Sequence, residues 1–198
     1  MITASVVTWE NGTDLVLDAA VTADVETVWT VMTDPEAVAE WFAPFTVEES
    51  AGEGSGGSDS EDSSGDGPAD GGRTLLFRMD ENPDEEPLRA ELVDIEDHGH
   101  VLVEFGALGK VGIGITPTDD PGAGGTRIVV THTFESLAEA ATVIADIGPV
   151  WETHLRYLLE MLGVPDTTVE EQELYTRYAQ LADEVAAEAD TDATEEDR

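Results

Sequence analysis

The sequence predicts an α+β fold in which a curved antiparallel sheet packs around one long helix near the C-terminus. Three observations support this fold. A strand at residues 15–21 is followed by two short helices, apolar segments separated by short turns then run from residue 45 to 134, and an amphipathic helix follows at 150–162. Consecutive strands joined by short turns form an antiparallel meander. A sheet and a helix that each have one apolar face bury those faces against each other.

The two short helices have clear start and stop signals. Asp24 is placed to cap the first helix, because its side chain can accept hydrogen bonds from the free amides of the first turn. Asp34 and Pro35 end that helix and start the second, with Asp34 as the cap and Pro35 at the first helical position. Apolar residues recur on one side of each helix: Val25, Val28, Trp29 and Met32 in the first, and Val38, Trp41 and Phe42 in the second.

Six further strands are predicted, at residues 45–49, 74–79, 88–96, 101–105, 110–116 and 126–134. Tight turns are expected at 97–100 and 121–125. Residues 50–72 are almost all Gly, Ser, Asp and Glu. Such a segment cannot bury enough apolar area to offset its ordering entropy, so a flexible acidic loop inside the domain is expected.

The C-terminal part is expected to be helical. A capping box at Ser136 and Glu139 predicts a helix over 137–145, and Gly148-Pro149 is expected to open a separate helix over 150–162. A last helix is predicted over 169–187, with fraying after residue 189. Its apolar seam consists of Leu174, Tyr178, Leu181 and Val185. The expected organisation is one domain over residues 1–165 and an acidic helical extension over 166–198.

The charge of the chain is extreme. There are 45 acidic and 8 basic residues among 198, which gives a formal net charge of -37. Disorder is excluded for most of the chain because 40% of the residues are hydrophobic and they fall in periodic segments. At about 1 M salt the Debye length is about 3 Å, so self-repulsion largely disappears. We therefore expect a halophilic protein, and no nucleic-acid partner, because phosphate contacts need clustered basic residues.

The composition also narrows the chemistry. There are no cysteines, which excludes disulfides, thiolate nucleophiles and thiolate-bound metals. No secretory signal and no apolar stretch of membrane-spanning length is visible, so a cytoplasmic protein without membrane insertion is expected. No cofactor motif and no metal site is predicted. His98 and His100 flank a turn glycine with no third histidine nearby, and are expected to be solvated turn residues.

Four stretches together resemble the START-like or SRPBCC superfamily, the helix-grip fold also found in birch-pollen allergen and polyketide cyclases. They are Val28-Trp29 with Thr33-Asp34-Pro35 and Trp41-Phe42, the hairpin of 91–95 and 101–103, the strand 125–132, and the spacing of Trp151, Leu155 and Leu158. The chain is most similar to the branch named after activators of the 90-kDa heat-shock chaperone ATPase. The resemblance covers about residues 14–163. The acidic loop is longer than the family usually carries, and the helix after Pro165 is an addition.

The resemblance implies an apolar cavity between the long helix and the sheet. Strand alternation places Ile128, Val130, His132 and Phe134 on one face, which puts His132 near the cavity if that face points inward. His132 is the one weak candidate for a catalytic residue, with a hydrogen-bonded core histidine as the alternative. Trp29 and Trp151 are expected in the core and Trp41 near the cavity mouth. The residues predicted to contact a ligand are Trp41, Arg78, Val130, His132, Phe134, Trp151 and His154.

Two of these residues have equally simple alternatives. Arg78 shares a face with Leu76 on its predicted strand, so it can project into the cavity and bind an acidic group of a ligand; a surface ion pair is the alternative. His154 precedes the helix residue Leu155 and can face the cavity or be partly exposed.

Three functions remain open from the sequence. Noncovalent binding of a hydrophobic small molecule, lipid-like or aromatic, is favoured because no catalytic set of residues stands out. The alternatives are a protein-interaction module, co-chaperone-like or regulatory, and an enzyme of cyclase or hydrolase type that uses a pocket histidine. The C-terminal helix can cover the pocket or form a homodimer.

Overall fold

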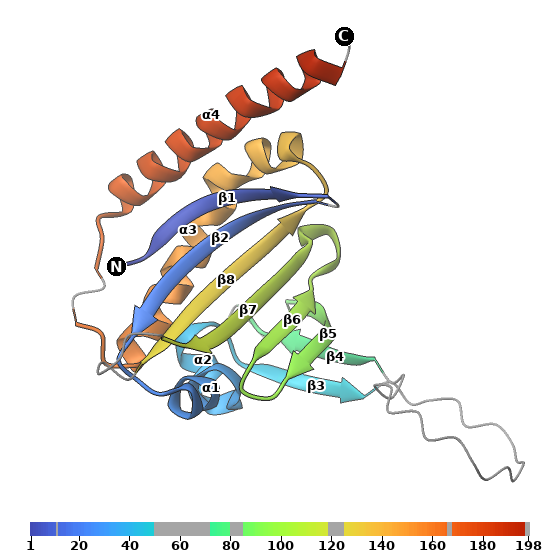
Figure 1. Cartoon of the computed structure of the whole chain (residues 1–198). Helices are drawn as coiled ribbons and strands as arrows, with labels where there is room; N and C mark the ends of the chain where they lie inside the picture. Colours follow the sequence, from blue (N-terminus) through green and yellow to red (C-terminus); the bar gives the residue numbers. More distant parts are fainter. Residues whose placement is uncertain (11, 50–71, 80–84, 119–124, 166–167, 197–198) are drawn as a thin grey trace, which may run out of the picture.

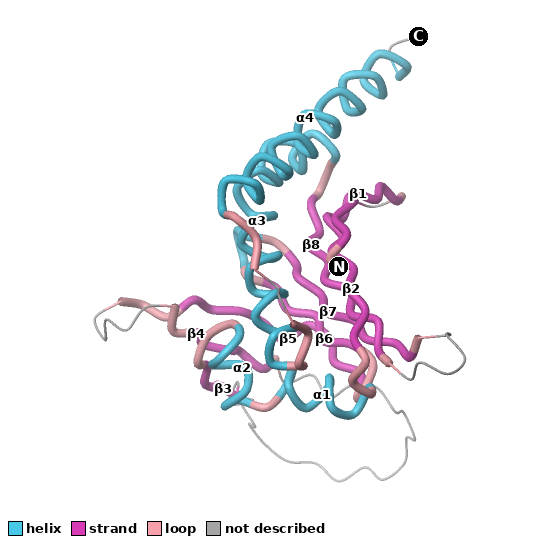
Figure 2. Tube along the Cα trace, turned by 90° about the vertical axis from the view of Figure 1, so that its left-hand side faces the viewer, coloured by secondary structure: helices cyan, strands magenta, loops and turns pink. Residues whose placement is uncertain are grey.

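A computed structural model describes residues 1–10, 12–49, 72–79, 85–118, 125–165 and 168–196 of the chain. Within these residues, eight strands form one antiparallel sheet in the order β1-β2-β8-β7-β6-β5-β4-β3 (Figure 1). The sheet curves, and the long helix α3 lies on its concave side, as the view turned by 90° shows (Figure 2). This is the predicted α+β architecture. The acidic segment 50–71 and most of the turn predicted at 121–125 lie outside the described residues.

The strands are β1 (Thr3–Trp9), β2 (Gly12–Val21), β3 (Phe45–Glu49), β4 (Arg73–Phe77), β5 (Leu88–Glu96), β6 (His100–Glu104), β7 (Lys110–Pro117) and β8 (Thr126–Phe134). The helices are α1 (Val25–Thr33), α2 (Pro35–Trp41), α3 (Leu137–Met161) and α4 (Glu171–Glu196), with a 3-10 turn, η1, at Gly106–Leu108. Among the described residues no helix is long and apolar enough to cross a membrane.

The caps of α1 and α2 are those that the sequence predicts. The side chain of Asp24 accepts a hydrogen bond from the amide of Thr27 at 2.8 Å. The side chain of Asp34 accepts from the amides of Glu36 and Ala37 at 3.0 and 3.1 Å. Pro35 needs no such partner, since it has no amide hydrogen. The chain therefore changes direction at Asp34, which ends α1 and caps α2, and both helices lie at the same end of the sheet.

Strand β1 was not predicted. It pairs with β2 from Thr3 opposite Asp18 to Trp9 opposite Gly12. Its sequence alternates, with Ala4 and Val6 packed against the core, but it lies at the edge of the sheet and most of its side chains are exposed. The sequence Asn-Gly at 11–12, where β2 begins, is a pair favoured in hairpin turns and was the available signal.

Helix α3 corrects the prediction of two separate helices. It runs without a break through Gly148 and Pro149, both of which are buried. Proline in a helix interior removes one hydrogen bond and crowds the preceding turn, which is why a helix start was expected there. Burial of α3 along its whole length outweighs that local cost, with Ala140 and Ile144 buried before Pro149 and Leu155 and Leu158 buried after it.

Helix α4 packs on α3 through the seam that the sequence predicts. Leu174, Tyr178 and Val185 are buried, and they belong to the same hydrophobic cluster as the sheet and α3. The seam is thus covered within one chain. A homodimer through the C-terminal helix stays a prediction. The helix also continues to Glu196, beyond the predicted fraying point.

A buried carboxylate fixes this packing. Glu152 of α3 is fully buried, and its oxygens accept hydrogen bonds from Arg156 at 2.5 and 3.1 Å, from Arg177 at 2.6 Å and from the Tyr178 hydroxyl at 2.8 Å. Arg177 and Tyr178 belong to α4, so Glu152 joins the two helices. Burial, followed by the nearby Glu152 charge, raises the pKa of Tyr178, which therefore remains a donor.

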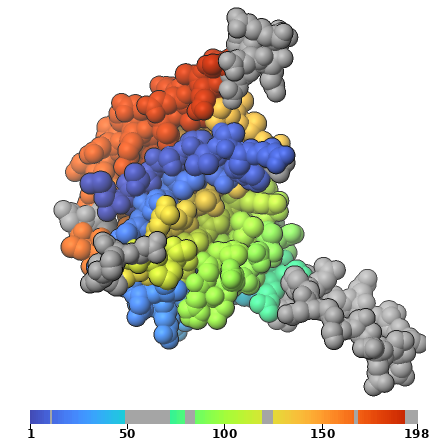
Figure 3. Space-filling model, in the orientation of Figure 1, coloured from blue at the N-terminus to red at the C-terminus, as the bar shows by residue number. Residues whose placement is uncertain are grey.

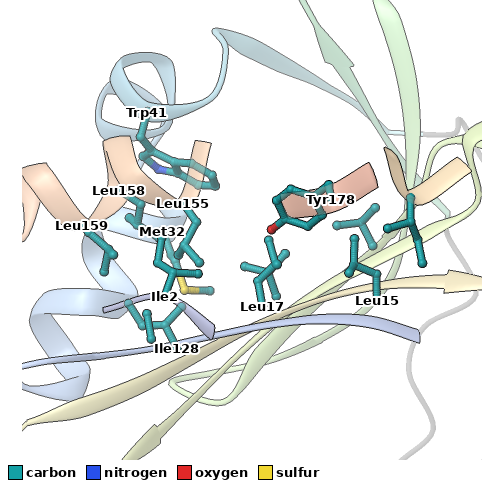
Figure 4. Close-up of a cluster of buried hydrophobic side chains, with 14 of the residues drawn as sticks. Ile2, Leu15, Leu17, Met32, Trp41, Ile128, Leu155, Leu158, Leu159 and Tyr178 are labelled. Carbon is teal, nitrogen blue, oxygen red and sulfur yellow. The ribbon is translucent and has the colours of Figure 1, made fainter. Parts of the chain in front are cut away.

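The core lies between α3 and the inner face of β2 and β8. Leu15, Leu17 and Ile128 of the sheet gather below Leu155, Leu158 and Tyr178 of the helices (Figure 4). The opposite face of the sheet forms part of the molecular surface, where β1 and β2, then β8, then β7 and β6 follow one another (Figure 3). The same buried cluster extends to Val38 and Trp41 of α2, Phe77 of β4 and Val111 of β7.

Candidate functional site

An apolar cavity of about 540 Å³ lies between the short helices, the inner face of β3–β7 and the second half of α3. Its size falls in the range typical of small-molecule sites, about 300–1,000 Å³. Among the described residues of the lining, only Thr33 and Arg73 contribute polar or charged side chains apart from the tryptophan indoles. The lining residues are Met32, Thr33, Pro35, Val38, Trp41, Phe42, Phe45, Val47, Arg73, Leu75, Phe77, Leu92, Ile95, Val101, Val103, Phe105, Val111, Ile113 and Trp151.

The floor of the cavity is a row of residues across the sheet. Arg73 of β4 pairs with Leu92 of β5, Leu92 with Val103 of β6, and Val103 with Val111 of β7. All four line the cavity. The next residue in the row is His132 of β8, which pairs with Val111. The row therefore runs from an exposed arginine at one end to a buried histidine at the other.

The inner end of the cavity is aromatic. The ring of Phe42 stacks on Trp151, with centroids 5.9 Å apart and planes 16° apart. It also meets Phe77 edge-on at 5.1 Å and Phe105 at 6.4 Å. Phe77 and Phe105 are buried, and they touch each other at 5.8 Å. These rings come from the residue after α2, from β4, from α3 and from the residue after β6, so the aromatic wall forms only in the folded chain.

The outer end of the cavity opens to solvent. Val47 is 50% exposed and Ile95 is 47% exposed, although both line the cavity. Arg73 is exposed at the same end of the floor. Large apolar side chains that are half exposed beside a hollow are typical of a binding mouth, whereas isolated ones are common on any surface.

The polar groups of the lining are mostly satisfied within the protein. The Trp41 indole N–H donates to the carbonyl of Val31 at 3.0 Å, and the Thr33 hydroxyl donates to the carbonyl of Trp29 at 2.8 Å. The Trp151 indole N–H donates to Nδ1 of His132 at 2.8 Å. These side chains therefore present apolar surface to the cavity.

His132 is a buried histidine that is hydrogen-bonded to Trp151. It is 2% exposed, and its ring stacks on Phe134 with centroids 4.6 Å apart. Since an indole N–H can only donate, Nδ1 of His132 accepts and the proton of the neutral ring lies on Nε2, where it is available for the backbone hydrogen bond at Leu108. Burial lowers the pKa of His132, and the Leu108 hydrogen bond partly offsets this. The ring stays neutral and holds Trp151 in place.

His154 lies behind the aromatic wall. Its Nδ1 is 3.0 Å from the carbonyl oxygen of Trp41, and its ring meets Phe42 edge-on at 4.8 Å. Burial lowers the pKa of this histidine, again with partial compensation from the backbone hydrogen bond. His154 thus contacts two residues that line the cavity, Trp41 and Phe42, without lining it itself.

The family comparison agrees with this geometry. Residues 13–162 match the model of a family described as "Polyketide cyclase / dehydrase and lipid transport". The chain belongs to this family. No curated protein is significantly similar to the chain.

Solved structures match the fold of this family member over most of its length. CalU16 from Micromonospora echinospora has a TM-score of 0.58 and 16% identity, with 92% of this chain and 97% of that chain covered. EF2215 from Enterococcus faecalis, a conserved protein of unknown function, has a TM-score of 0.62 and 13% identity, with 92% and 91% covered. Each alignment leaves fewer residues of this chain uncovered than the 26 residues of α4. Both alignments therefore include part of α4, the helix that the sequence analysis describes as an addition to the family.

The predicted ligand-contact residues divide into two groups. Trp41 and Trp151 line the cavity, although Trp41 is a buried part of its wall and not a residue of its mouth. Val130, His132 and Phe134 point inward as predicted but are buried in the core, outside the lining.

Arg78 and Trp29 lie outside the cavity lining. β4 ends at Phe77, so Arg78 lies beyond the strand and is exposed. Trp29 is half-buried: it packs against the core and stacks on His98, with centroids 5.7 Å apart.

Several lining residues were missed by the sequence reasoning. Arg73, Leu75 and Phe77 alternate along β4 and share its inner face. That alternation was the signal, and it was obscured because the strand was predicted to begin one residue later. Phe42 was noticed only as part of the apolar side of α2.

The remaining titratable clusters lie on the surface. His100 contacts Asp94 at 2.8 Å, which lowers the pKa of that carboxyl, and His98 contacts Asp97 at 3.0 Å. No group of three or more metal-ligating side chains occurs in the described part of the chain. A second hollow of about 470 Å³ lies between α3 and the start of α4, and polar and charged side chains make up half of its lining.

Proposed function

We propose that the protein binds a hydrophobic small molecule, noncovalently, in the cavity between the short helices and β3–β7. The observation that carries this proposal is the lining itself: 540 Å³ of space whose walls are apolar and whose tryptophan and threonine donors are all used elsewhere. Membership in a family described by polyketide cyclisation and lipid transport supports the same class of ligand.

The physical basis is burial of apolar surface. Transfer of apolar area from water into such a site is worth about 25 cal/mol per Å². A ligand that enters between Phe42, Trp151 and Val111 also gains contacts with rings whose positions are already fixed by His132 and His154. Such preorganisation lowers the entropic cost of binding.

Catalysis by His132 has no support from its geometry. A general base must reach the proton that it removes. Nδ1 of His132 accepts from the indole of Trp151, and Trp151 lines the cavity whereas His132 does not. Binding is therefore proposed without a chemical step at this residue.

Two finer proposals depend on the sequence alone. Similarity to the heat-shock ATPase activator branch is proposed from the signature around Trp29, Asp34-Pro35 and Trp41. A salt-loaded cytoplasm is proposed from the net charge of -37.

Binding can be tested with the uncharged dye N-phenyl-1-naphthylamine, which fluoresces in apolar sites. In 3 M KCl the wild-type protein is expected to bind it, and V103F, which adds bulk to the middle of the cavity floor, is expected to weaken binding at least fivefold. V93F is the matched control, because Val93 is 46% exposed and does not line the cavity. Equal affinity in wild type and V103F, or no binding by the wild type, would refute the proposal.

A further inference from the structure

Arg73 is the one basic residue among the described residues that line the cavity, in a chain with few basic residues. Arg73 is among 8 basic residues set against 45 acidic ones. It shares the inner face of β4 with Leu75 and Phe77, and all three line the cavity. A guanidinium on this face is unexpected if the site takes only uncharged hydrocarbon, since a purely apolar ligand offers it no partner.

The hydrogen-bond donors of the lining single out the same residue. Trp41, Trp151 and Thr33 donate to Val31, His132 and Trp29, and so have no donor left for a ligand. By contrast, Arg73 makes no hydrogen bond or ion pair with the side chains that the structure describes, whereas Arg89 on the neighbouring strand pairs with Glu48 at 3.3 Å. The guanidinium is thus the one side-chain donor of the described lining that remains available.

We propose that Arg73 binds the acidic group of an amphipathic ligand, a carboxylate or a sulfonate, while the apolar body of the ligand lies along the floor towards Trp151. This inference rests on the proposed binding function and adds a class of ligand to it. A planar guanidinium can donate two parallel hydrogen bonds to such an anion, which gives orientation as well as affinity.

The floor sets the size of this ligand. Three strand spacings separate Arg73 from Val111 in the row Arg73, Leu92, Val103 and Val111. At about 4.8 Å per spacing, the path along the sheet is about 14 Å. A ligand of this length has its acid at the exposed end of the cavity and its apolar end against Phe42 and Trp151.

The position of Arg73 also suits the charge of the molecule. A net charge of -37 repels anions at low ionic strength, so an acidic ligand needs a local cation to bind. High salt removes the long-range repulsion but weakens a contact with direct hydrogen bonds much less. Acidic ligands are therefore expected to bind better in concentrated KCl than in dilute buffer.

The test uses two dyes with the same aromatic frame. 1-Anilinonaphthalene-8-sulfonate carries an acid, and N-phenyl-1-naphthylamine does not. In 3 M KCl, R73Q is expected to weaken binding of the sulfonate about three- to tenfold and to change binding of the neutral dye less than twofold. R73K, which keeps the charge but not the planar fork, is expected to lie between wild type and R73Q.

Two other arginines serve as comparisons. R89Q is the control, because Arg89 is exposed, paired with Glu48 and outside the lining. R78Q tests the arginine that the sequence pointed to, and is expected to change neither dye. Far-UV circular dichroism of each variant shows whether the fold is retained.

The outcomes separate the two proposals. If R73Q leaves the ratio of the two affinities unchanged, or if R78Q or R89Q lowers it as much, the role of Arg73 is overturned while neutral-dye binding still supports the cavity. If the wild type binds neither dye, the cavity function is overturned and the role of Arg73 falls with it.

Discussion

Gly148 of α3 leaves room for the ring of Tyr178 of α4, so its replacement by alanine is a direct test of how α4 docks. A methyl group at this position would overlap the Cδ1 and Cε1 atoms of Tyr178 and would lie 2.8 Å from its Cγ. Tyr178 is fully buried and its hydroxyl donates to Glu152 at 2.8 Å. The ring cannot move aside without disturbing that hydrogen bond, so α4 itself must shift.

The size of the effect follows from three contributions. Overpacking of a tight core contact costs about 1–3 kcal/mol. Loss or distortion of a hydrogen bond to a charged acceptor costs about 1.5–3 kcal/mol. Alanine gains about 1 kcal/mol over glycine in a helix interior. The net destabilisation of G148A is therefore expected to be about 1.5–5 kcal/mol. For a chain of this length this lowers Tm by about 3–20 °C.

Thermal unfolding followed by circular dichroism in 3 M KCl measures this shift. G114A is the matched control, because no atom lies within 4 Å of the position that its methyl group would take. It is expected to change Tm by no more than about 2 °C. The double variant G148A/Y178A is expected to be more stable than the sum of the single changes predicts, since the overlap disappears with the ring. A G148A protein as stable as the wild type would show that α4 does not dock as described.

Three other predictions concern charge. E152Q removes the carboxylate shared by Arg156 and Arg177, and is expected to lower the free energy of unfolding measured in urea by about 3 kcal/mol. An unchanged urea midpoint would contradict the role of Glu152 in joining α3 to α4. Burial lowers the pKa of His132 and His154, so as pH falls below about 6.5 the unfolded chain takes up protons before the folded chain does. The unfolding free energy is therefore expected to be level above about pH 7 and to fall below about pH 6.5, less steeply in H154Q, whereas a level profile down to pH 5 would refute this. Dilution from 3 M to 0.1 M KCl is expected to abolish much of the far-UV circular dichroism signal, and a fold indifferent to dilution would contradict the halophilic interpretation.

Local signals in the sequence predicted helix starts and strand bounds well where these depend on neighbouring residues alone. Asp24 and Asp34 cap α1 and α2 as expected, because a cap depends only on the next three residues. β5 and β8 have the predicted bounds, since a strand with one buried face alternates clearly. These elements are sufficient for the fold class.

Long-range packing explains what the sequence did not predict. Pro149 looked like a helix start because the burial that keeps α3 continuous comes from distant strands and from α4. The seam of α4 did not reveal its partner within the chain, because Gly148, which makes room for Tyr178, lies 30 positions earlier. Local patterns contain no information on either partner.

The site was predicted less well than the fold for a similar reason. Its floor is a row across four strands, and the register that aligns Arg73, Leu92, Val103 and Val111 depends on hairpins and on the bulge between Leu92 and Asp94. A shift of one residue moves a side chain to the other face of the sheet. His132 was placed inward correctly, but its partner Trp151 approaches from a helix and decides that the histidine supports the cavity without lining it.

The central claim is that the cavity holds a hydrophobic ligand, and native mass spectrometry of freshly purified protein tests it most directly. The spectrum should show a protein species heavier than the 21.1 kDa chain by the mass of a small molecule. Organic extraction should release that molecule, and V103F should carry much less of it than V93F. Wild-type protein that is free of any bound molecule and binds neither dye would contradict the account.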